Sequence, residues 1–584
     1  MTTRHCAGFV GIWVRAAPGS AFLVHRGSHW CLAGLRRHVG QSATHLRSRF
    51  RLAAFAMNVS TDGGGLYDER DGEGESGMFE DAREAAVRGV STAVPLSADA
   101  NVNRSKVKDK YVSVFKVFVH KTEPSFSSPW QMKRQRSSTG SAFAISGQRL
   151  LTNAHVVAYA SQVLVRRHGE AKRYIARIIA VAHDSDLALL HVEDPAFWAK
   201  GIQPLELKDD APHLQDSVTV IGYPSGGENL SITAGVVSRV DVWNYAHSGC
   251  RMLCIQIDAA INSGNSGGPA LNKDLECVGI AFQSRTHADN IGYIVPVPII
   301  KRFLRDIEQF GGDNYQGVVT LGIVYQKMEN EQLRKYTGLA AVKEEDLPEG
   351  ISARGVYVCY VDPLKTDTEY FHPGDVILAM DSMDIDMDGT VKFREMERVD
   401  MLYALTEKLM GDEIRVVLLR DREVIERTFK LSKVLTLVPI VQYDVKPRYL
   451  IYAGCVFTPL SCDYLRAEYG TKYMEKANTS LLAALLENFR EFPDQEIVLM
   501  SQVLAHESNV GYEFRKQILQ SVNGNPIRNL AHLGKFLDET KDDFISFEFN
   551  FGVRACFEKE TSDACLPEIL KENNISSARF LEET

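Results

Sequence analysis

Apolar and polar residues alternate in short runs through the middle of the chain. Residues 111–119 are rich in β-branched and aromatic side chains that alternate with polar ones, which predicts a strand. Many short strands with few helical stretches are typical of a β-barrel or sandwich domain, and an amphipathic pattern over 299–310 predicts a helix that closes this domain. Further strands are predicted at 141–145, 161–166, 175–182, 187–192, 218–223, 231–240, 254–257 and 278–283.

Two smaller units follow, over residues 317–433 and 440–553. Each has an apolar strand, a polar turn, a short strand, a helix and a final strand, which indicates a weak internal repeat. The helix is predicted around 398–409 in the first unit and over 530–537 in the second, where a strand over 544–551 follows. Residues 554–584 are charged without a strong pattern and are predicted to form a C-terminal tail.

The N-terminal region differs in composition from the rest of the chain. Residues 1–61 contain eight arginines, no lysine and no acidic residue, which is the composition of an organelle transit peptide. The alternatives are a secretory signal built on the apolar stretch 6–14 and a basic tail without a targeting function. Met57 could also serve as an internal translation start. Residues 62–108 are rich in Gly, Asp, Glu and Ser, so we expect a disordered linker.

Composition limits the remaining function classes. The chain has 584 residues, 45% hydrophobic and 24% charged, which is ordinary for a soluble protein of about three or four domains. A net charge of −9 gives no overall attraction to nucleic acid. No apolar run is long enough to span a membrane. The ten cysteines show no zinc spacing, and Cys250 and Cys254 are interpreted as strand cysteines, so no metal or cofactor is expected.

The most informative segment is Gly-Asn-Ser-Gly-Gly-Pro at 264–269. A serine hydroxyl needs a base to accept its proton and backbone N–H groups to stabilise the oxyanion. Glycines permit a tight turn that directs several N–H groups inward. Ser266 is therefore the candidate nucleophile, and Gly264, Asn265 and Ser266 are the candidate oxyanion donors. Such a turn alone is weak support, because it also occurs in ordinary loops.

Two other segments supply the missing partners. His155 follows a predicted strand in Leu-Thr-Asn-Ala-His, and Asp186 directly precedes the apolar strand that begins at Leu187. The order His, Asp, Ser is that of chymotrypsin-type proteases. His155 would act as general base and Asp186 would orient it. Asp184 competes for the last role, and His183 is interpreted as a flanking surface residue.

These motifs resemble the HtrA/Deg (protease Do-like) family, and most closely its plant-type and protist branch with two PDZ domains. The resemblance implies a mainly β chain: a chymotrypsin-like double β-barrel protease domain over 109–312, followed by two PDZ-like α+β domains. It also implies assembly into trimers or multiples of trimers. Ala142 and Ser263 depart from the residues common in the family, glycine and proline. The motifs that carry the resemblance are Gly-Ser-Ala-Phe at 140–143, Thr-Asn-Ala-His at 152–155, Asp-Leu-Ala-Leu-Leu at 186–190, Ile-Gly-Tyr-Pro at 221–224, Gly-Val-Val-Ser at 235–238 and the serine turn.

Specificity and recruitment are predicted more coarsely. Ile280, Ala281 and Phe282 would line the S1 pocket or only pack the barrel, and the absence of an acid there argues against Lys or Arg at P1. Leu321, Gly322 and Ile323 resemble the loop with which the first PDZ domain binds a peptide carboxylate. Residues 453–457 occupy the corresponding place in the second unit.

The expected function is ATP-independent serine endopeptidase activity on misfolded or damaged proteins. The alternative is a chaperone or peptide-binding scaffold with latent proteolysis, and a weaker third hypothesis is nucleic-acid association through the basic N-terminus. The arginine-rich N-terminus favours the mitochondrial matrix. A plastid-type organelle is the second choice, and translation from Met57 would allow the nucleus or cytosol.

Overall fold

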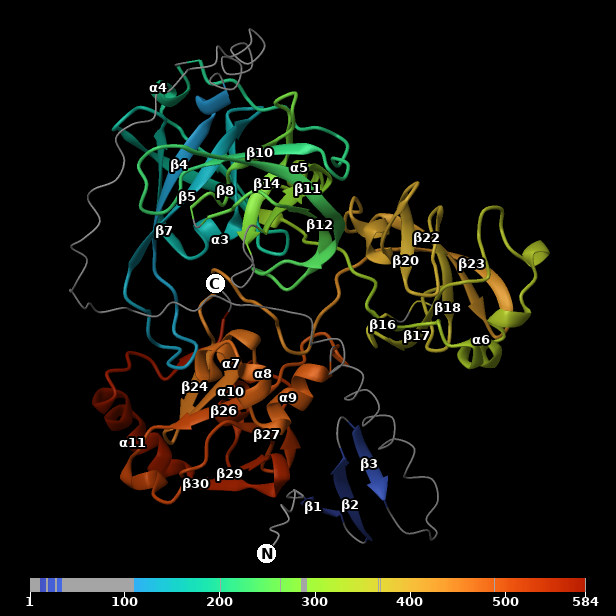
Figure 1. Cartoon of the computed structure of the whole chain (residues 1–584). Coiled ribbons are helices and arrows are strands. Elements are labelled where there is room, and N and C mark those ends of the chain that lie inside the picture. The colour runs from blue at the N-terminus through green and yellow to red at the C-terminus, as the bar shows by residue number, and fades with distance from the viewer. Residues whose placement is uncertain are drawn as a thin grey trace, which may run out of the picture. The chain divides into compact units, whose positions relative to one another are not determined.

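The computed structural model describes residues 11–16, 19–26, 29–33 and 110–582, except 200, 263, 285–290, 366, 368 and 488 (Figure 1). Ser263 and the predicted linker therefore lie outside the described residues. The chain divides into two units, residues 1–63 and 64–584. In the first unit, β1 (Gly11–Ala16), β2 (Gly19–Arg26) and β3 (His29–Ala33) form an antiparallel sheet, which the sequence pattern did not predict.

The first six strands of the second unit close into a barrel in the order β4-β5-β6-β9-β8-β7. Most of them were predicted within a few residues, because each combines β-branched residues with a polar turn. The short β6 is the predicted strand that precedes His155. The strands are β4 (Val114–Lys121), β5 (Arg136–Ile145), β6 (Arg149–Thr152), β7 (Ala160–Arg167), β8 (Arg173–Ala182) and β9 (Leu187–His191), with the short helices α3 (Ala154–Val157) and α4 (Pro195–Trp198).

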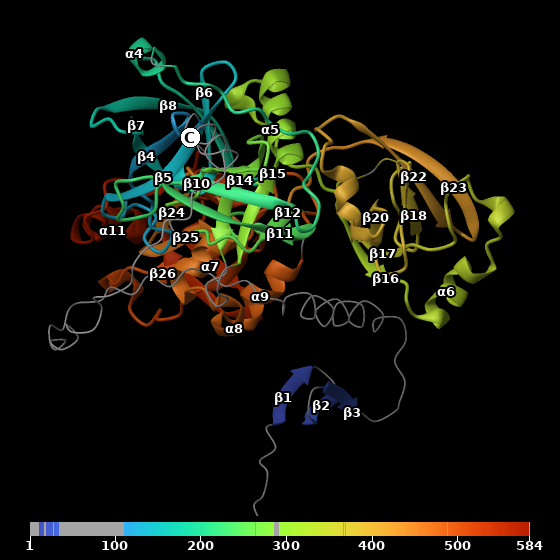
Figure 2. The same ribbon diagram turned by 45° about the horizontal axis from the view of Figure 1, so that its top comes forward.

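A second closed barrel follows in the order β10-β11-β12-β15-β14-β13. The predicted helix is present as α5 (Val297–Phe310), which lies along β14 and β15 (Figure 2). The two barrels confirm the predicted chymotrypsin-like double β-barrel. The strands are β10 (Ser217–Gly222), β11 (Ser231–Asn244), β12 (Arg251–Ile257), β13 (Pro269–Leu271), β14 (Cys277–Ser284) and β15 (Gly292–Pro296).

One continuous hydrophobic cluster joins the two barrels. It contains Phe143 and Leu189 of the first barrel together with Tyr223 and Leu253 of the second, each at most 1% exposed. Burial of apolar surface contributes roughly 25 cal/mol per Å², so this shared core holds the barrels together. The loops that carry the predicted site residues emerge from the two barrels beside this cluster.

The first PDZ-like unit has a sheet in the order β16-β17-β18-β22-β23, with β19 beside β18. Its first strand, β16, forms an edge of this sheet. The strands are β16 (Ile323–Lys327), β17 (Val356–Val361), β18 (Val376–Met380), β19 (Met383–Asp384), β22 (Glu413–Arg420) and β23 (Glu423–Lys430), and the helix α6 spans Glu331–Thr337.

The prediction of a helix around residues 398–409 is wrong. The structure has a hairpin of β20 (Thr390–Arg394) and β21 (Glu397–Asp400), followed by a short 3-10 helix over Met401–Leu405. The Asp400 carboxylate accepts a hydrogen bond from the Leu402 N–H and caps that helix, so helical backbone begins only after the strand. The hairpin also contacts the second barrel, since Arg394 donates to the Pro212 carbonyl at 3.0 Å and Arg251 pairs with Asp400 at 2.8 Å.

The second PDZ-like unit has a sheet in the order β30-β29-β27-β26-β25-β24-β31, with β28 beside β27. The predicted helix over 530–537 and strand over 544–551 are present as α10 and β29. The strands are β24 (Tyr449–Tyr452), β25 (Cys455–Pro459), β26 (Val498–Val503), β27 (Gln517–Val522), β28 (Asn525–Pro526), β29 (Phe544–Phe549), β30 (Arg554–Glu558) and β31 (Arg579–Phe580). The helices are α7 (Cys462–Tyr469), α8 (Tyr473–Lys476), α9 (Thr479–Leu486), α10 (Leu530–Glu539) and α11 (Lys559–Glu572).

The prediction of a separate C-terminal tail after residue 553 is also wrong. Residues 554–580 supply β30, α11 and β31, and Ile569 and Ile575 are buried. The backbone N–H of Ile451 in β24 donates to the Ala578 carbonyl at 2.8 Å. The charged residues hid this contribution in the sequence, because the few apolar side chains that are buried are widely spaced.

Removal of residues 575–584 should loosen the second PDZ-like unit. The truncation takes away the buried Ile575 and the half-buried Leu581, a loss of roughly 2–4 kcal/mol of hydrophobic stabilisation. We expect faster hydrogen–deuterium exchange of the β24 amides in the truncated protein. As a control, Asp538→Ala removes only the exposed ion pair with Arg579 (2.7 Å) and should leave β24 protected. Equal exchange in wild type and truncation would contradict this prediction.

Candidate active site

A buried carboxylate meets a histidine where the two barrels join. Asp186 is 1% exposed, and its Oδ2 accepts a hydrogen bond from His155 Nδ1 at 2.7 Å. Asp186 Oδ1 also accepts from the His155 backbone N–H at 2.9 Å, and its carbonyl accepts from Asn153 Nδ2 at 2.8 Å. This arrangement places the proton on Nδ1 and leaves His155 Nε2 as an acceptor.

Strand register explains why these residues meet. Thr152 at the end of β6 pairs with Ala188 in β9, so the residues after β6 and before β9 are neighbours. Asp186 has a φ of 53°, a left-handed conformation that aspartate tolerates better than most residues. Burial would raise the pKa of the Asp186 carboxyl, but the charge of the adjacent His155 imidazole and the two hydrogen bonds from His155 lower it below its ordinary value.

The competing acid, Asp184, does not contact His155. Its Oδ1 accepts from the Tyr315 hydroxyl at 2.7 Å and its Oδ2 accepts from the Val318 N–H at 2.5 Å. Both partners lie in the segment that leads into the first PDZ-like unit. The choice of Asp186 over Asp184 as the residue that orients His155 agrees with this geometry.

The serine turn is held against the first barrel. Ser141 Oγ donates to the Gly264 carbonyl at 2.8 Å, and the Ser141 N–H donates to the Ser266 carbonyl at 2.8 Å. Gly264 and Gly267 have φ values of 100° and 85°, which only glycine adopts at little cost. A Cβ at Gly140 would lie 2.7 Å from the Val156 side chain and 3.4 Å from the Ser266 carbonyl, so α3 and the turn meet there.

Ser266 Oγ donates to the Phe282 carbonyl at 3.4 Å, and no hydrogen bond joins it to His155 among the described residues. Hydrogen bonds of this kind are often long or absent in an enzyme without substrate. The geometry therefore places the candidate base and its acid in contact and leaves the serine hydroxyl turned toward β14.

Two of the three predicted oxyanion donors are available. Within the described part of the chain, the backbone N–H groups of Gly264 and Ser266 donate to no acceptor. The N–H of Asn265 instead donates to the Asn262 carbonyl at 3.0 Å, so its inclusion as a donor is corrected. The Asn265 side chain is fully buried beneath the turn.

The predicted S1 residues differ in their surroundings. Ile280 is fully buried in the core cluster. Ala281 ties β14 to the serine turn, since its carbonyl accepts from the Gly267 N–H at 2.9 Å. Phe282 is buried against the Tyr245 ring, at 4.7 Å between centroids, and its carbonyl meets Ser266 Oγ. Phe282 is the member of this set that contacts the candidate nucleophile.

Sequence reasoning missed an aromatic and histidine cluster beside His155. The His247 ring lies 6.1 Å from the His155 ring, and Tyr443 stacks on His247 at 3.9 Å between centroids. His183, expected to be a flanking surface residue, is half-buried and contacts both His247 and Asp444. No local pattern identifies this cluster, because Tyr443 and Asp444 come from the segment before β24, far along the chain from the other members.

The predicted carboxylate loop of the first PDZ-like unit leads into the edge strand β16. Gly322 has a φ of 60°, and its carbonyl accepts from the Asp362 N–H at 2.8 Å. The Leu321 carbonyl accepts from the Tyr370 hydroxyl. These two hydrogen bonds hold the loop through its carbonyl oxygens. They do not use the backbone N–H groups of the loop, which are the groups that would bind a peptide carboxylate.

The second PDZ-like unit differs at the corresponding place. Its order β25-β26-β27-β29-β30 matches β16-β17-β18-β22-β23, but the outer edge of β25 is already paired with β24. Ala453 and Gly454 form the tight turn between these strands, and Asn509 Nδ2 donates to the Ala453 carbonyl at 2.9 Å. The expectation that 453–457 forms a carboxylate loop is therefore wrong, since the chain itself occupies that edge.

Comparisons with known proteins agree with this architecture. The profile of the trypsin-like peptidase domain matches residues 140–280, and that of a PDZ domain matches residues 438–580. The chain is 40% identical over 492 residues to "Protease Do-like 2, chloroplastic" of Arabidopsis thaliana, covering 83% of this chain and 77% of the relative. The chain belongs to the Deg (protease Do-like) family. This Deg protease is a serine endopeptidase, as the sequence resemblance implied.

Other relatives span similar parts of the chain. "Protease Do-like 4, mitochondrial" of Arabidopsis thaliana is 39% identical over 461 residues, 78% of this Deg protease and 82% of the relative. Among solved structures, an "HtrA-type protease AlgWS227A with decapeptide" has 24% identity and a TM-score of 0.43, and covers 56% of this chain and 97% of its own. Among the described residues, every helix falls short of the length and hydrophobicity needed to cross a bilayer.

Gly267→Ala should abolish activity by displacing Ser266. The new Cβ would lie 2.0 Å from the Ser141 carbonyl oxygen, and the φ of 85° is unfavourable for alanine. Gly226→Ala is a matched control, because Gly226 has a φ of 76° with nothing within 4 Å, and it should cost only about 1–2 kcal/mol of stability. Casein degradation and thermal unfolding of both variants test this pair. Full activity of Gly267→Ala would show that the turn has no such constraint.

Proposed function

We propose that this Deg protease degrades misfolded or damaged proteins through an acyl-enzyme intermediate formed on Ser266. The 2.7 Å hydrogen bond between His155 and the buried Asp186, next to the serine turn, is the main support. Ser266 Oγ would attack the scissile carbonyl while His155 Nε2 accepts its proton. Asp186 would stabilise the imidazolium and keep the ring in the required tautomer.

The backbone N–H groups of Gly264 and Ser266 would bind the oxyanion. Their lack of acceptors among the described residues supports this role, since prearranged donors stabilise the developing charge without reorganisation. His155 would return its proton to the leaving amine, and water would then release the acyl group. None of these steps needs ATP or a metal ion. Phe282, with Ile280 and Ala281 behind it, would shape an S1 pocket suited to apolar P1 side chains.

In this proposal the first PDZ-like unit recruits the substrate. Leu321, Gly322 and Ile323 would bind the terminal carboxylate of a misfolded chain, which would add as a strand to β16. The position of β16 at a sheet edge supports this assignment. Assembly into trimers or multiples of trimers, which sedimentation of the purified protein would measure, completes the proposal.

The second candidate function is a chaperone or peptide-binding scaffold with latent proteolysis. The observation that favours it is the Ser266 hydroxyl, which donates to the Phe282 carbonyl and not to His155. A serine held in that position would attack a carbonyl only after it turned toward the base.

Ser266→Ala should reduce casein degradation to background, a loss of about 10⁴-fold or more in kcat. The exposed Ser238 of β11 offers a matched control, and Ser238→Ala should keep full activity. Quenched peptides with alanine or valine at P1 should be cleaved by wild type faster than peptides with arginine. If wild type and Ser266→Ala were equally inert but both suppressed aggregation of an unfolded protein, the chaperone function would replace the proposed one.

We also propose that this protease resides in an organelle, with the mitochondrial matrix as the first choice. The arginine-rich, acid-free residues 1–61 support this, as do relatives whose names specify mitochondria or chloroplasts. We expect N-terminal sequencing of the protein from its own cells to find that the mature chain begins well after residue 1, near the end of the acid-free segment. An intact N-terminus in a protein recovered from the cytosol would contradict the organelle assignment.

A further inference from the structure

A chain of hydrogen bonds ends beside the candidate base. Asp444 Oδ2 accepts from His183 Nε2 at 2.8 Å, and His183 Nδ1 lies 3.0 Å from His247 Nε2. Tyr443 covers both imidazoles, with ring centroids 3.9 Å from His247 and 4.6 Å from His183. His247 in turn faces His155 at 6.1 Å. Tyr443 and Asp444 together are called the latch below.

The latch carboxylate fixes the protons along this chain. Because Asp444 is an acceptor, neutral His183 carries its proton on Nε2 and presents an unprotonated Nδ1. That nitrogen can only accept, so His247 donates from Nε2 and leaves its own Nδ1 unprotonated. The orientation of each ring is therefore set by Asp444, in the same way that Asp186 sets the orientation of His155.

The latch also joins three segments of the protease domain that surround His155. Asp444 Oδ1 accepts from the backbone N–H of Tyr159, directly after the helix that carries His155. The Tyr443 hydroxyl donates to the His247 carbonyl at 2.9 Å, in the loop between β11 and β12. His183 belongs to the loop that carries Asp186. Two consecutive latch residues thus hold both triad loops of the first barrel and one loop of the second.

We propose that the latch and the His183–His247 pair position His155 for turnover, so that release of the latch lowers the rate of catalysis. This inference rests on the proposed function, because it assigns His155 the role of general base. His247 and His183 are positioning residues in it and do not react with substrate.

Charge gives the cluster a second property. Burial lowers the pKa of His247 to about 3, although the facing carboxylates Asp186 and Asp444 act in the opposite direction; the other charged neighbours, His155 and His183, lower it further. His247 under its Tyr443 cover is therefore neutral at pH 7 and in mildly acidic solution. An uncovered His247 would regain a pKa of about 6.5, and its charge at acid pH would repel the imidazolium that His155 forms during turnover.

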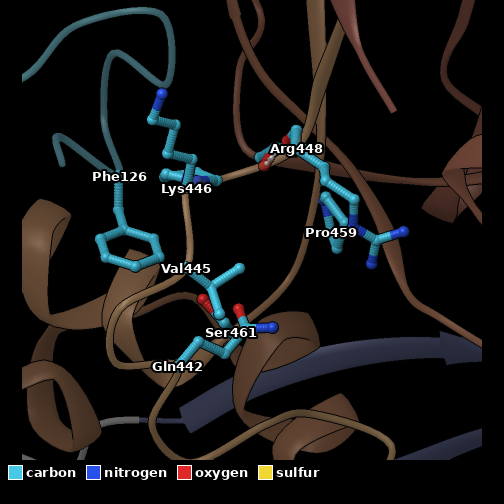
Figure 3. A pocket seen from close by; sticks show the side chains of 9 residues that line it. Phe126, Gln442, Val445, Lys446, Arg448, Pro459 and Ser461 are labelled. Carbon is cyan, nitrogen blue, oxygen red and sulfur yellow. Dashed lines mark hydrogen bonds between the residues drawn. The ribbon is translucent and has the colours of Figure 1, made fainter. Parts of the chain in front are cut away.

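The latch is tied to the second PDZ-like unit. The N–H of Gln442, just before it, donates to Asp463 Oδ2 in α7 at 2.7 Å. Phe126, from the loop between β4 and β5, lines a pocket together with Gln442, Val445 and Lys446 (Figure 3). In the same loop, Trp130 packs edge-on against Tyr449 of β24 at 5.9 Å. Movement of this unit would therefore pull on the latch.

Steady-state kinetics of the full chain on a quenched peptide test the proposal. We expect Tyr443→Ala and Asp444→Asn each to lower kcat by about ten-fold or more, with KM changed less than about two-fold, because a misplaced base loses rate without losing binding. Tyr443→Phe keeps the stacked ring and loses only the hydrogen bond to the His247 carbonyl, so it should lower kcat less than Tyr443→Ala does. Asp216→Asn is the matched control, since it removes an exposed histidine–aspartate pair with His213 at 3.8 Å.

The pH profile separates positioning from general damage. In wild type His247 stays neutral, so it should add no ionisation to the acid limb of kcat/KM. In Tyr443→Ala that limb should gain a second ionisation at about pH 6.5, which His247→Gln in the same background should remove. A variant that was only partly unfolded would lose amplitude at all pH values.

The outcomes are distinct. Activity of Ser266→Ala equal to wild type would refute the proposed function itself. If Ser266→Ala is inactive while Tyr443→Ala and Asp444→Asn keep wild-type kcat and an unchanged acid limb, the latch proposal is overturned and the proposed function stands. A rise in kcat in both variants would also overturn it, because the latch would then restrain the enzyme. Should Tyr443→Ala fail to fold, the nearly isosteric Asp444→Asn decides.

Discussion

The hydrogen bond from His155 to the buried carboxylate of Asp186 constrains the whole protease domain. A carboxylate that is 1% exposed must be compensated by partners, since an unpaired buried charge costs several kcal/mol. Here both partners of the carboxylate belong to His155 in α3, whose Nδ1 donates to Oδ2 and whose backbone N–H donates to Oδ1. Asn153 adds a hydrogen bond to the Asp186 backbone carbonyl. The first barrel must therefore keep the register of β6 against β9 for the charge to be tolerated, and this requirement constrains the loop from 183 to 186.

That loop divides its tasks residue by residue. Asp186 holds His155, and Ser185 is buried. Asp184 binds Tyr315 and Val318 on the way into the first PDZ-like unit. His183 binds Asp444 on the way into the second. The connections to both later units thus end within three residues of the Asp186 carboxylate. Regulation by those units needs no long path through the core, because their attachment points and the acid share one short stretch of backbone.

The sequence predicted what depends on local pattern and failed where distant segments decide. Strands of both barrels, α5 and α10 follow from residue alternation and apolar periodicity, and the pairing of His155 with Asp186 follows from motif order. The supposed helix over 398–409 is a hairpin, because pairing with β20 and the cap at Asp400 outweigh a weak helical pattern. Two other features bring together segments that are far apart in the sequence, so no local pattern predicts them. They are the joining of residues 554–580 to the sheet through β24, and the contact of Tyr443 with His247. The catalytic roles of the site residues remain predictions.

The pairing of β24 with β25 has a consequence for multivalency. A chain with two PDZ-like units would be expected to grip a long unfolded substrate at two points, and to gain avidity from the linker between them. Because β24 already fills the edge at which the second unit would accept a strand, one subunit offers a single strand-addition position of this kind. Avidity for an unfolded chain would then have to come from the proposed association of several chains and not from the number of PDZ-like units in each.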